Sequence, residues 1–308
     1  MFAHRSILTS SRRLFSTATH TKKSKKLQTL LLGTACLTAS YFGWEKYDAY
    51  TNNNKLSQDQ YTPLGLIKKQ QISPDSYLLR LEVKKEQNKE YPVPSCVYIK
   101  DDAIQVMRPY TPINQNPYLD GYMDLVIKKY QDGSVSRTLT SFTPHQHKVH
   151  IRGPMVEPEC LYEPKSVDEV GMIAGGTGIS PMYQLICRIL ENPDDQTTSV
   201  WLIYGNKTEK DILLRQELDQ LQAKYNDRFR VKYVLEDPPS DAYERGYVTE
   251  NMIRDMMLNK EKRKIYVCGP NRMLAAVCGE RARDYSQGPV TGLLSELGFQ
   301  SDEIWKFQ

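Results

Sequence analysis

The residues best suited to chemistry in this chain form a glycine loop between an expected strand and an expected helix. Residues 170–190 read VGMIAGGTGISPMYQLICRIL, so an apolar run gives way to Gly175-Gly176-Thr177-Gly178 and then to Ser180-Pro181. Serine is a favoured N-cap and proline a favoured first helical residue, so we expect the helix to begin there. Such a unit points backbone N–H groups and a positive helix dipole at an anion, such as a diphosphate. The loop departs from the G-x-G-x-x-G pattern at Pro181, and a tight turn without a ligand is the alternative interpretation.

A second group of candidate residues lies near the ends of two expected strands upstream of this loop. Arg108-Pro109-Tyr110-Thr111 combines a forked cation for a diphosphate, a flat apolar ring and a hydroxyl that can hydrogen-bond a ring nitrogen. Lys128 follows Val126 on the next expected strand as a candidate ligand-facing cation, and residues 133–137 form a turn that ends in Arg137. Each piece alone is an ordinary surface feature, so their combination carries the argument.

The elements that would position these residues fall into two parts with different hydrophobic periods. From residue 61 to residue 157 the period is two, as in Leu79, Leu81 and Val83, and turn signals separate the apolar runs. Short alternating strands without long helical patterns predict a small antiparallel barrel. Residues 158–169 would link it to a second part, from residue 170 to residue 308, where strands and helices alternate. That alternation predicts a doubly wound parallel sheet.

The second part contains the predicted parallel strands and their connecting helices. Besides the strand before the glycine loop, we expect strands at residues 200–204, 231–235 and 264–268. We expect helices at residues 211–225, at residues 250–258 behind the N-cap Thr249, and from Asn271 onward. The expected fold class is therefore an antiparallel barrel followed by a doubly wound α/β domain.

The N-terminal segment has the composition of a targeting signal followed by a membrane anchor. Residues 1–26 are rich in Arg, Lys, Ser and Thr, as mitochondrial targeting segments are, and Arg13-Leu14-Phe15-Ser16 resembles a matrix processing site. A disordered basic arm is the alternative. Residues 27–44 carry no charge, and a membrane-spanning helix needs roughly 17–25 residues. A buried helix of the folded part is the alternative to this transmembrane helix, and residues 45–60 would form a linker.

Composition limits the class of protein. The chain has 308 residues, 40% hydrophobic and 25% charged, which suits a globular protein of two domains. The net charge is +4, but residues 1–44 hold seven basic residues and no acidic one, which leaves 34 basic against 37 acidic residues. This slightly acidic body gives no support for a nucleic-acid partner. The six cysteines form no C-x-x-C pair, so no metal site is expected, while a disulfide stays open.

Taken together and in this order, the motifs of residues 61–308 closely resemble the ferredoxin-reductase superfamily, and its cytochrome b5 reductase branch fits best. In that family the barrel binds FAD and the parallel domain binds the nicotinamide nucleotide. The resemblance implies that Arg108 holds the FAD diphosphate, that Tyr110 packs along the flavin and that Thr111 faces flavin N5. It makes Thr111 and Cys268 the candidate catalytic residues. The other cofactor contacts that it implies are Pro109, Val126, Lys128, Val135, Ser136 and Ser180 for FAD, and Gly175, Gly176, Thr177, Gly178, Pro181, Gly269, Pro270 and Met273 for the nicotinamide nucleotide.

One departure from the family pattern bears on the subgroup. The family usually has glycine-lysine-methionine-serine where this chain reads Gly133-Ser134-Val135-Ser136, so a phosphate cation is missing and Arg137 is its candidate replacement. The layout is similar to fungal mitochondrial flavoproteins of cytochrome c maturation in its presequence, its single span, this turn and the tail from Gln287 to Leu294. The fungal mitochondrial cytochrome b5 reductases are the close alternative, because they share the anchor but normally keep the lysine-methionine turn.

We therefore expect a membrane-anchored mitochondrial FAD protein that takes hydride from NADH or NADPH and passes single electrons to a haem acceptor of the cytochrome c pathway. The alternatives are a cytochrome b5 reductase and a flavin- or haem-binding assembly factor without turnover. Lysines before the span predict an inner-membrane anchor with the body in the intermembrane space, and an outer-membrane anchor is the alternative. Glu244 lies where related reductases carry an acid near the adenosine ribose, which would favour NADH, although a solvated glutamate is an equal interpretation.

Overall fold

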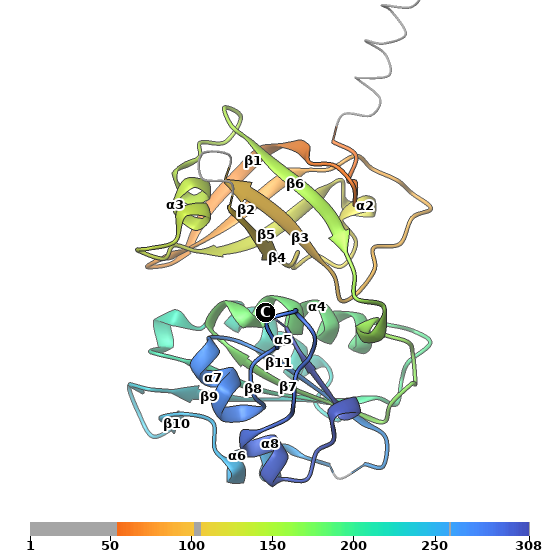
Figure 1. The fold of residues 1–308 in the computed structure, drawn as a ribbon, viewed down its shortest axis with the longest axis vertical. Coiled ribbons are helices and arrows are strands. Elements are labelled where there is room, and N and C mark those ends of the chain that lie inside the picture. Colours follow the sequence, from red (N-terminus) through yellow and green to blue (C-terminus); the bar gives the residue numbers. More distant parts are fainter. Residues whose placement is uncertain (1–53, 102–105, 259, 308) are drawn as a thin grey trace, which may run out of the picture. The chain divides into compact units, whose positions relative to one another are not determined.

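The computed structural model describes residues 54–101, 106–258 and 260–307 (Figure 1). The predicted targeting segment and the predicted transmembrane helix, residues 1–44, lie outside the described residues. In the ranges just given, every helix falls short of the length or the apolar character that crossing a bilayer requires. Residues 54–308 form one compact unit, so the expected domain boundary at residues 158–169 stays a prediction.

The first sheet is antiparallel, as predicted. Its strands, in the order β4-β3-β6-β1-β2-β5 across the sheet, are β1 (Thr62–Ser73), β2 (Ser76–Glu82), β3 (Cys96–Asp101), β4 (Val106–Tyr110), β5 (Tyr122–Lys128) and β6 (Lys148–Met155). Period-two alternation explains the core, because in β3 the buried positions are Val97, Ile99 and Asp101 while their neighbours are only partly covered. The inward side chains of the strands form one hydrophobic cluster.

The two edge strands of this sheet meet just beyond the end of β4. Pro112 forms an isolated antiparallel bridge with Leu125 of β5, and Ile113 N donates to Asp124 O at 2.9 Å. The sheet can curl this far because β1 pairs with β6 through its first residues and with β2 through the rest, with register shifts between. The antiparallel sheet therefore closes on itself at the strand end that carries Arg108 to Thr111.

Two short helices, which the period-two pattern did not predict, accompany this sheet. They are α2 (Pro117–Asp120) and α3 (Ser134–Ser141). Helix α3 buries Val135 and Leu139, which are four residues apart and so share one helical face. Two apolar residues at that spacing are too few to stand out in the sequence, which is why the expectation of an all-strand region was wrong here.

The second sheet is parallel and doubly wound, as predicted (Figure 1). Its strands run in the order β10-β9-β8-β7-β11-β12, where β7 is Glu169–Gly175, β8 is Ser199–Asn206, β9 is Phe229–Leu235, β10 is Glu244–Arg245, β11 is Arg263–Cys268 and β12 is Ile304–Lys306. The helices are α4 (Ile179–Leu190), α5 (Arg215–Lys224), α6 (Glu250–Met256), α7 (Asn271–Val277) and α8 (Gly292–Glu296). Side chains of α4 and α5 join one core cluster, and those of α6, α7 and α8 join the cluster on the other face.

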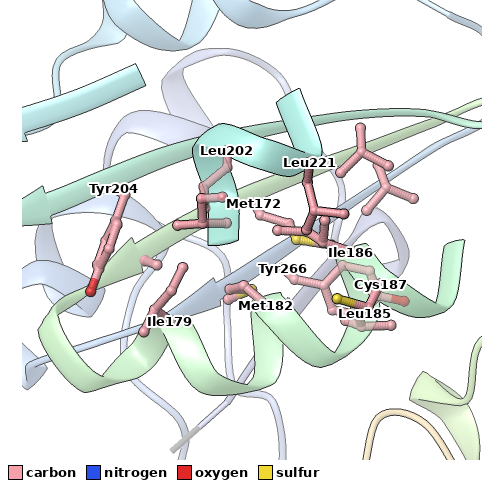
Figure 2. Close-up of a cluster of buried hydrophobic side chains, with 14 of the residues drawn as sticks. Met172, Ile179, Met182, Leu185, Ile186, Cys187, Leu202, Tyr204, Leu221 and Tyr266 are labelled. Atoms are coloured by element: carbon pink, nitrogen blue, oxygen red, sulfur yellow. The ribbon is translucent and has the colours of Figure 1, made fainter. Parts of the chain in front are cut away.

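Helix α4 is held to the sheet by its apolar face. Met182, Leu185 and Ile186 are fully buried, and Figure 2 shows them between the helix and the side chains of Met172 and Leu202. Burying a side chain of this size contributes about 1.5–3 kcal/mol. The helix is therefore a rigid part of the core, and the predicted apolar spacing along it is confirmed.

Two predicted helix starts were wrong. Helix α4 begins at Ile179 behind a 3₁₀ turn over Gly176–Gly178, so Ser180 lies inside the first turn and is not the N-cap. A 3₁₀ turn feeding straight into the helix leaves no extended residue to act as a side-chain cap. Helix α5 begins at Arg215 and not at residue 211, because residues Glu209–Asp211 form their own 3₁₀ turn, closed by a capping box between Thr208 and Asp211.

Candidate active site between a flavin half and a nucleotide half

The glycine loop lies at the point where the strand order of the parallel sheet reverses. Strand β7 is flanked by β8 on one side and by β11 on the other, and open α/β sheets bind ligands at the carboxyl ends of strands at this switch point. The loops after β7 and β11 touch, since a Cβ added at Gly178 would lie 2.2 Å from Cys268 O. The fold therefore brings together the predicted nucleotide residues of both loops, from Gly175 to Pro181 and from Cys268 to Met273. We call this region the nucleotide half of the site.

The glycines of this loop serve two different purposes. At Gly178 and Gly175 they allow close packing, because a Cβ at Gly175 would meet Met273 Sδ at 2.8 Å and Pro270 Cδ at 2.9 Å. At Gly176 the backbone has φ +52°, and no atom lies within 4 Å of the position of an added Cβ. Gly176 thus opens onto free space with its bare backbone, which is what a bulky anion needs to approach the main chain.

Cys268, a candidate catalytic residue, ends β11 beside this loop. Burial raises the pKa of its thiol to about 12. The thiol is therefore protonated at neutral pH, and it has the chemistry of a small packing group with a weak donor and not that of a thiolate nucleophile.

The predicted flavin residues Arg108 to Thr111 occupy the end of β4 and the residue after it. Strand register pairs Ile99 with Arg108 and Val97 with Tyr110, so Arg108 and Tyr110 project from the same face and Pro109 from the other. Arg108 is exposed, and its Nη1 donates to Met107 O at 2.9 Å. Among the described residues it forms no ion pair, so its forked cation is available to an anion. Burial raises the pKa of Tyr110 to about 12, which keeps its hydroxyl protonated. We call this strand end, with the facing residues of β5 and α3, the flavin half of the site.

Lys128 on β5 is less available than the sequence suggested. Its Nζ lies 3.0 Å from Asp75 Oδ2, in the turn between β1 and β2, and 3.5 Å from Asp211 Oδ1, in the parallel-sheet part. Burial alone would lower the pKa of Lys128, but the two carboxylates outweigh it and raise the pKa. Lys128 therefore forms an ion pair that joins β5 to the 3₁₀ turn before α5 in the parallel-sheet part. Val126, two residues earlier on the same strand, is buried in the core cluster of α4.

The residues after the turn, Val135 to Arg137, form the first turn of α3. Ser136 Oγ accepts a hydrogen bond from Tyr130 N at 3.3 Å and donates to Gly133 O at 3.2 Å, so this hydroxyl closes the turn itself. Val135 and Ser136 are buried, whereas Arg137 is exposed. Arg137 Nη1 donates to Gln131 O at the long distance of 3.5 Å, so Arg137 is the side chain of this turn that an anion could most easily recruit.

Several hydrogen bonds join the antiparallel sheet to the parallel-sheet part, and two of them bear on the site. The hydroxyls of Tyr130 and Thr177 lie 3.1 Å apart, which ties the segment after β5 to the glycine loop. Gln184 of α4 is the second contact, since its Nε2 donates to Pro112 O at 3.2 Å. The sequence interpretation missed Gln184. The available signal was a polar residue four positions after Ser180, on a helix whose other buried positions apart from Ser180 are apolar.

Glu244, the predicted discriminator between NADH and NADPH, is exposed in β10. Its Oε1 lies 3.4 Å from Lys232 Nζ, so it belongs to an ion pair. Together with Tyr233 and Tyr243 these residues line a cavity of about 660 Å³ along β9. The cavity lies toward the β10 edge of the parallel sheet, and β8 separates its strand β9 from β7, the strand that leads into the glycine loop.

Comparison with known families matches the two halves separately. Residues 63–159 match the family described as "Oxidoreductase FAD-binding domain", and residues 172–279 match the one described as "Oxidoreductase NAD-binding domain". The first match contains the Arg108 strand end, and the second contains both loops of the switch point. FAD and a nicotinamide nucleotide are thus the cofactors of these two folds.

Curated relatives and solved structures agree with each other. The chain is 40% identical over 265 residues to "NADH-cytochrome b5 reductase 2" of Mycosarcoma maydis, covering 82% of this chain and 74% of that protein. It is 42% identical over 205 residues to the protein of the same name in Pyricularia oryzae, where the match spans only 60% of the relative. The cytochrome b5 reductase domain of Ulva prolifera nitrate reductase superposes with a TM-score of 0.69 at 30% identity, covering 82% of this chain and 99% of that one.

Proposed function

The chain belongs to the cytochrome b5 reductase family of NAD(P)H-dependent flavin oxidoreductases, and we propose that it carries electrons from NADH through FAD to a haem protein of the cytochrome b5 type. The observation that supports this most is the junction of the two halves. One helix, α4, begins at the nucleotide loop and also hydrogen-bonds the segment that follows the flavin strand, through Gln184 and Pro112 O at 3.2 Å. A hydride can pass only between groups held in contact, and this junction meets that need.

The residues of the flavin half fit FAD. An exposed arginine without a carboxylate partner in the described chain suits a diphosphate, and the half-buried ring of Tyr110 on the same strand face suits a flat heterocycle. When bound, FAD supplies the chemistry of accepting a hydride and releasing electrons one at a time. Arg108 binds and orients, Tyr110 excludes water from one side, and Thr111 offers a hydroxyl to a ring nitrogen.

The residues of the nucleotide half fit a dinucleotide. Gly176 leaves space for a diphosphate above its backbone, and the N-terminus of α4 directs its positive dipole into the same region. The protonated thiol of Cys268 lies beside the loop, where it can pack against a nicotinamide ring without reacting with it. If the adenosine ribose binds beside Glu244, its carboxylate would repel a 2′-phosphate and favour NADH over NADPH; a solvated glutamate paired with Lys232 is the equal alternative.

The test is anaerobic mixing of the purified FAD-loaded protein with NADH. Bleaching of the flavin absorbance supports an enzyme. A flavin spectrum that stays oxidised would instead support the alternative of an assembly factor that binds flavin without turnover. Repeating the experiment with NADPH compares the two nucleotides directly, and we expect the slower reduction with NADPH.

A haem acceptor of the cytochrome c pathway is the second candidate. It is favoured by the turn Gly133-Ser134-Val135-Ser136-Arg137, which lacks the lysine of cytochrome b5-type reductases. The tail from Gln287 to Leu294 carries less weight, because it has a structural task. Gln287 Oε1 accepts from Lys306 N at 2.7 Å and Pro289 O accepts from Lys306 Nζ at 2.7 Å, so the tail holds β12 in place.

Gene deletion separates the two acceptors. If cytochrome b5 is the acceptor, mitochondria without the protein should lose NADH–cytochrome b5 reductase activity and keep normal holocytochrome c. Loss of holocytochrome c with unchanged cytochrome b5 reduction would support the second candidate. Purified protein mixed with each oxidised haem protein in turn gives the same comparison in solution.

We also propose that residues 1–26 direct the protein to mitochondria and that residues 27–44 anchor it in the inner membrane with the body in the intermembrane space. The basic residues before the uncharged stretch support this orientation. Protease added to intact mitochondria should leave the body uncut. Cutting of the body under those conditions would point to an outer-membrane anchor facing the cytosol.

A further inference from the structure

We propose that Gln184 is a positioning residue, which holds the flavin strand end in register with the nucleotide loop during reduction by NADH. This inference rests on the proposed function, since it assigns a residue to the transfer between the two halves. Gln184 is 1% exposed, and its side chain comes from α4, whereas its partners come from the antiparallel sheet. A buried amide with both ends engaged costs much to displace, because each broken hydrogen bond leaves a buried polar group unsatisfied.

The two hydrogen bonds of Gln184 end at the same place in the barrel. Its Oε1 accepts from Ser95 N at 3.0 Å, and Ser95 immediately precedes β3. Its Nε2 donates to Pro112 O at 3.2 Å, two residues after the end of β4. Strands β3 and β4 are antiparallel, with Val97 opposite Tyr110, so the start of one and the end of the other are neighbours. One side chain thus clamps the end of the strand pair that carries Tyr110 and Thr111.

The helix that provides the clamp is fixed on its other side. Ser180, Gln184 and Arg188 follow each other at intervals of four and so form one face of α4 toward the barrel. The opposite face, with Met182 and Leu185, is packed into the core of the parallel sheet (Figure 2). The N-terminus of the same helix is the glycine loop. Gln184 therefore keeps the glycine loop and the flavin strand end at a fixed separation.

This arrangement matters because transfer between two bound groups depends steeply on their separation. A misplacement of 1 Å can slow a reaction roughly 100-fold, even when the groups remain bound. Loss of Gln184 frees the Pro112 segment on the side of α4 and leaves its tie to β5, through Ile113 N and Asp124 O at 2.9 Å, intact. The strand end should then shift without the barrel coming apart.

The experiment compares Gln184→Met and Gln184→Glu with Arg188→Met in the full FAD-loaded chain. Arg188 is the matched control, because it lies one turn further along the same face and its Nη2 donates to a different barrel segment, at Tyr91 O, at 2.8 Å. The measurements are the rate constant of flavin reduction at saturating NADH, the dissociation constants of FAD and NAD⁺, and the visible circular dichroism of the oxidised flavin without nucleotide. The dichroism reports the flavin environment independently of turnover.

We expect Gln184→Met to slow flavin reduction roughly tenfold or more and to change the dichroism, while both dissociation constants stay within about threefold. Arg188→Met should leave the rate and the dichroism near those of the wild type. Gln184→Glu should recover its rate as the pH falls, because a carboxylic acid can donate to Pro112 O only while protonated. Gln184→Met, which has no proton to gain, should show no such recovery.

Three results would overturn the proposal. The first is equal rates for Gln184→Met and the wild type, the second is equal slowing by Gln184→Met and Arg188→Met, and the third is a Gln184→Glu rate without pH recovery. If Gln184→Met fails to fold, the pH series of Gln184→Glu decides alone. Failure of the proposed function is distinguishable, because the wild-type flavin would then stay oxidised in NADH.

Discussion

The flavin half and the nucleotide half of the site recognise their ligands with different parts of the chain. The flavin half presents side chains, and its main cation, Arg108, is exposed and donates a hydrogen bond to the Met107 carbonyl, with no ion pair to any residue that the structure describes. The nucleotide half presents backbone, and at Gly178 the loop packs so closely that an added Cβ would lie 2.2 Å from Cys268 O.

In the flavin half, ligand binding can therefore be changed without changing fold stability, so this is the separable half. In the nucleotide half the two change together, so this is the coupled half. A side chain that projects from a finished strand can be removed while the strand remains. A glycine that allows two loops to touch cannot be changed without moving the loops. Substitutions in the flavin half should therefore alter affinity, and substitutions in the nucleotide half should alter stability as well.

The sharpest test of the coupled half is Gly178→Ala. The added methyl has no space against the Cys268 carbonyl, so the loops must separate, and overpacking of this kind costs about 3 kcal/mol of unfolding free energy. Urea unfolding of the purified protein measures it. Gly176→Ala is the control, because its added methyl meets no atom within 4 Å. It should lose only about 1 kcal/mol of unfolding free energy, since residue 176 has a left-handed backbone. Equal losses for the two variants would contradict the close-packing explanation.

The corresponding test of the separable half is Arg108→Ala. Losing a charge-assisted hydrogen bond worth about 2 kcal/mol should weaken FAD binding about 30-fold, as measured by fluorescence titration of the apoprotein. The unfolding free energy of the apoprotein should change by less than about 0.5 kcal/mol, because the side chain is exposed. A variant that keeps its full FAD complement after dialysis would rule out this role for Arg108.

Acid should destabilise the parallel-sheet part of the molecule through Asp195. Asp195 follows α4 and is fully buried, and burial raises its pKa, but hydrogen bonds from Tyr162, Thr198 and Lys165 N outweigh this and lower it to about 2 from 3.8. A carboxylate with a depressed pKa stabilises the fold above its unfolded pKa, and that contribution is lost as the pH falls through the folded value. Between pH 7 and pH 3 the loss should be about 1 kcal/mol.

Asp195→Asn should therefore lower the unfolding free energy less at pH 3 than at pH 7 when both are measured by urea unfolding. Asp194→Asn, at the neighbouring exposed position, is the control and should show no such dependence on pH. A destabilisation by Asp195→Asn that is the same at both pH values would argue against this ionisation.

The smallest expected effect is that of Arg137→Ala on FAD affinity. We predict that Arg137 replaces the missing turn lysine as a second diphosphate contact, because it is exposed on α3 and its hydrogen bond to Gln131 O is long, at 3.5 Å. The dissociation constant of FAD should rise about fourfold, or about 0.8 kcal/mol. Lys129→Ala removes a nearby exposed charge and is the matched control. A change of less than about twofold, under roughly 0.5 kcal/mol, would mean that Arg137 is a solvated side chain.

Local patterns in the sequence were enough to predict both sheets and the glycine loop with its strand and helix, whereas the two cofactors followed from the family resemblance of the combined motifs. Alternation at period two and the change from apolar residues to glycines to an apolar helix depend only on near neighbours, so they can be read without the fold. The same reasoning failed where a local choice depends on a small difference in backbone geometry. Ser180 lies inside α4 because a 3₁₀ turn precedes it, and α3 forms with only two buried apolar side chains.

Only the tertiary structure decided which distant residues meet. Lys128 pairs with Asp211, 83 positions along the chain, and Gln184 reaches Pro112 across 72 positions. Neither pairing has a sequence signature, because each depends on how the parallel sheet and the barrel pack against one another. The sequence by itself determined the kinds of surface that bind the two cofactors, since those rest on residue type and local backbone. The separation between these surfaces is set by α4. Its apolar face packs into the core of the parallel sheet, while Gln184 hydrogen-bonds the antiparallel sheet at Ser95 and Pro112.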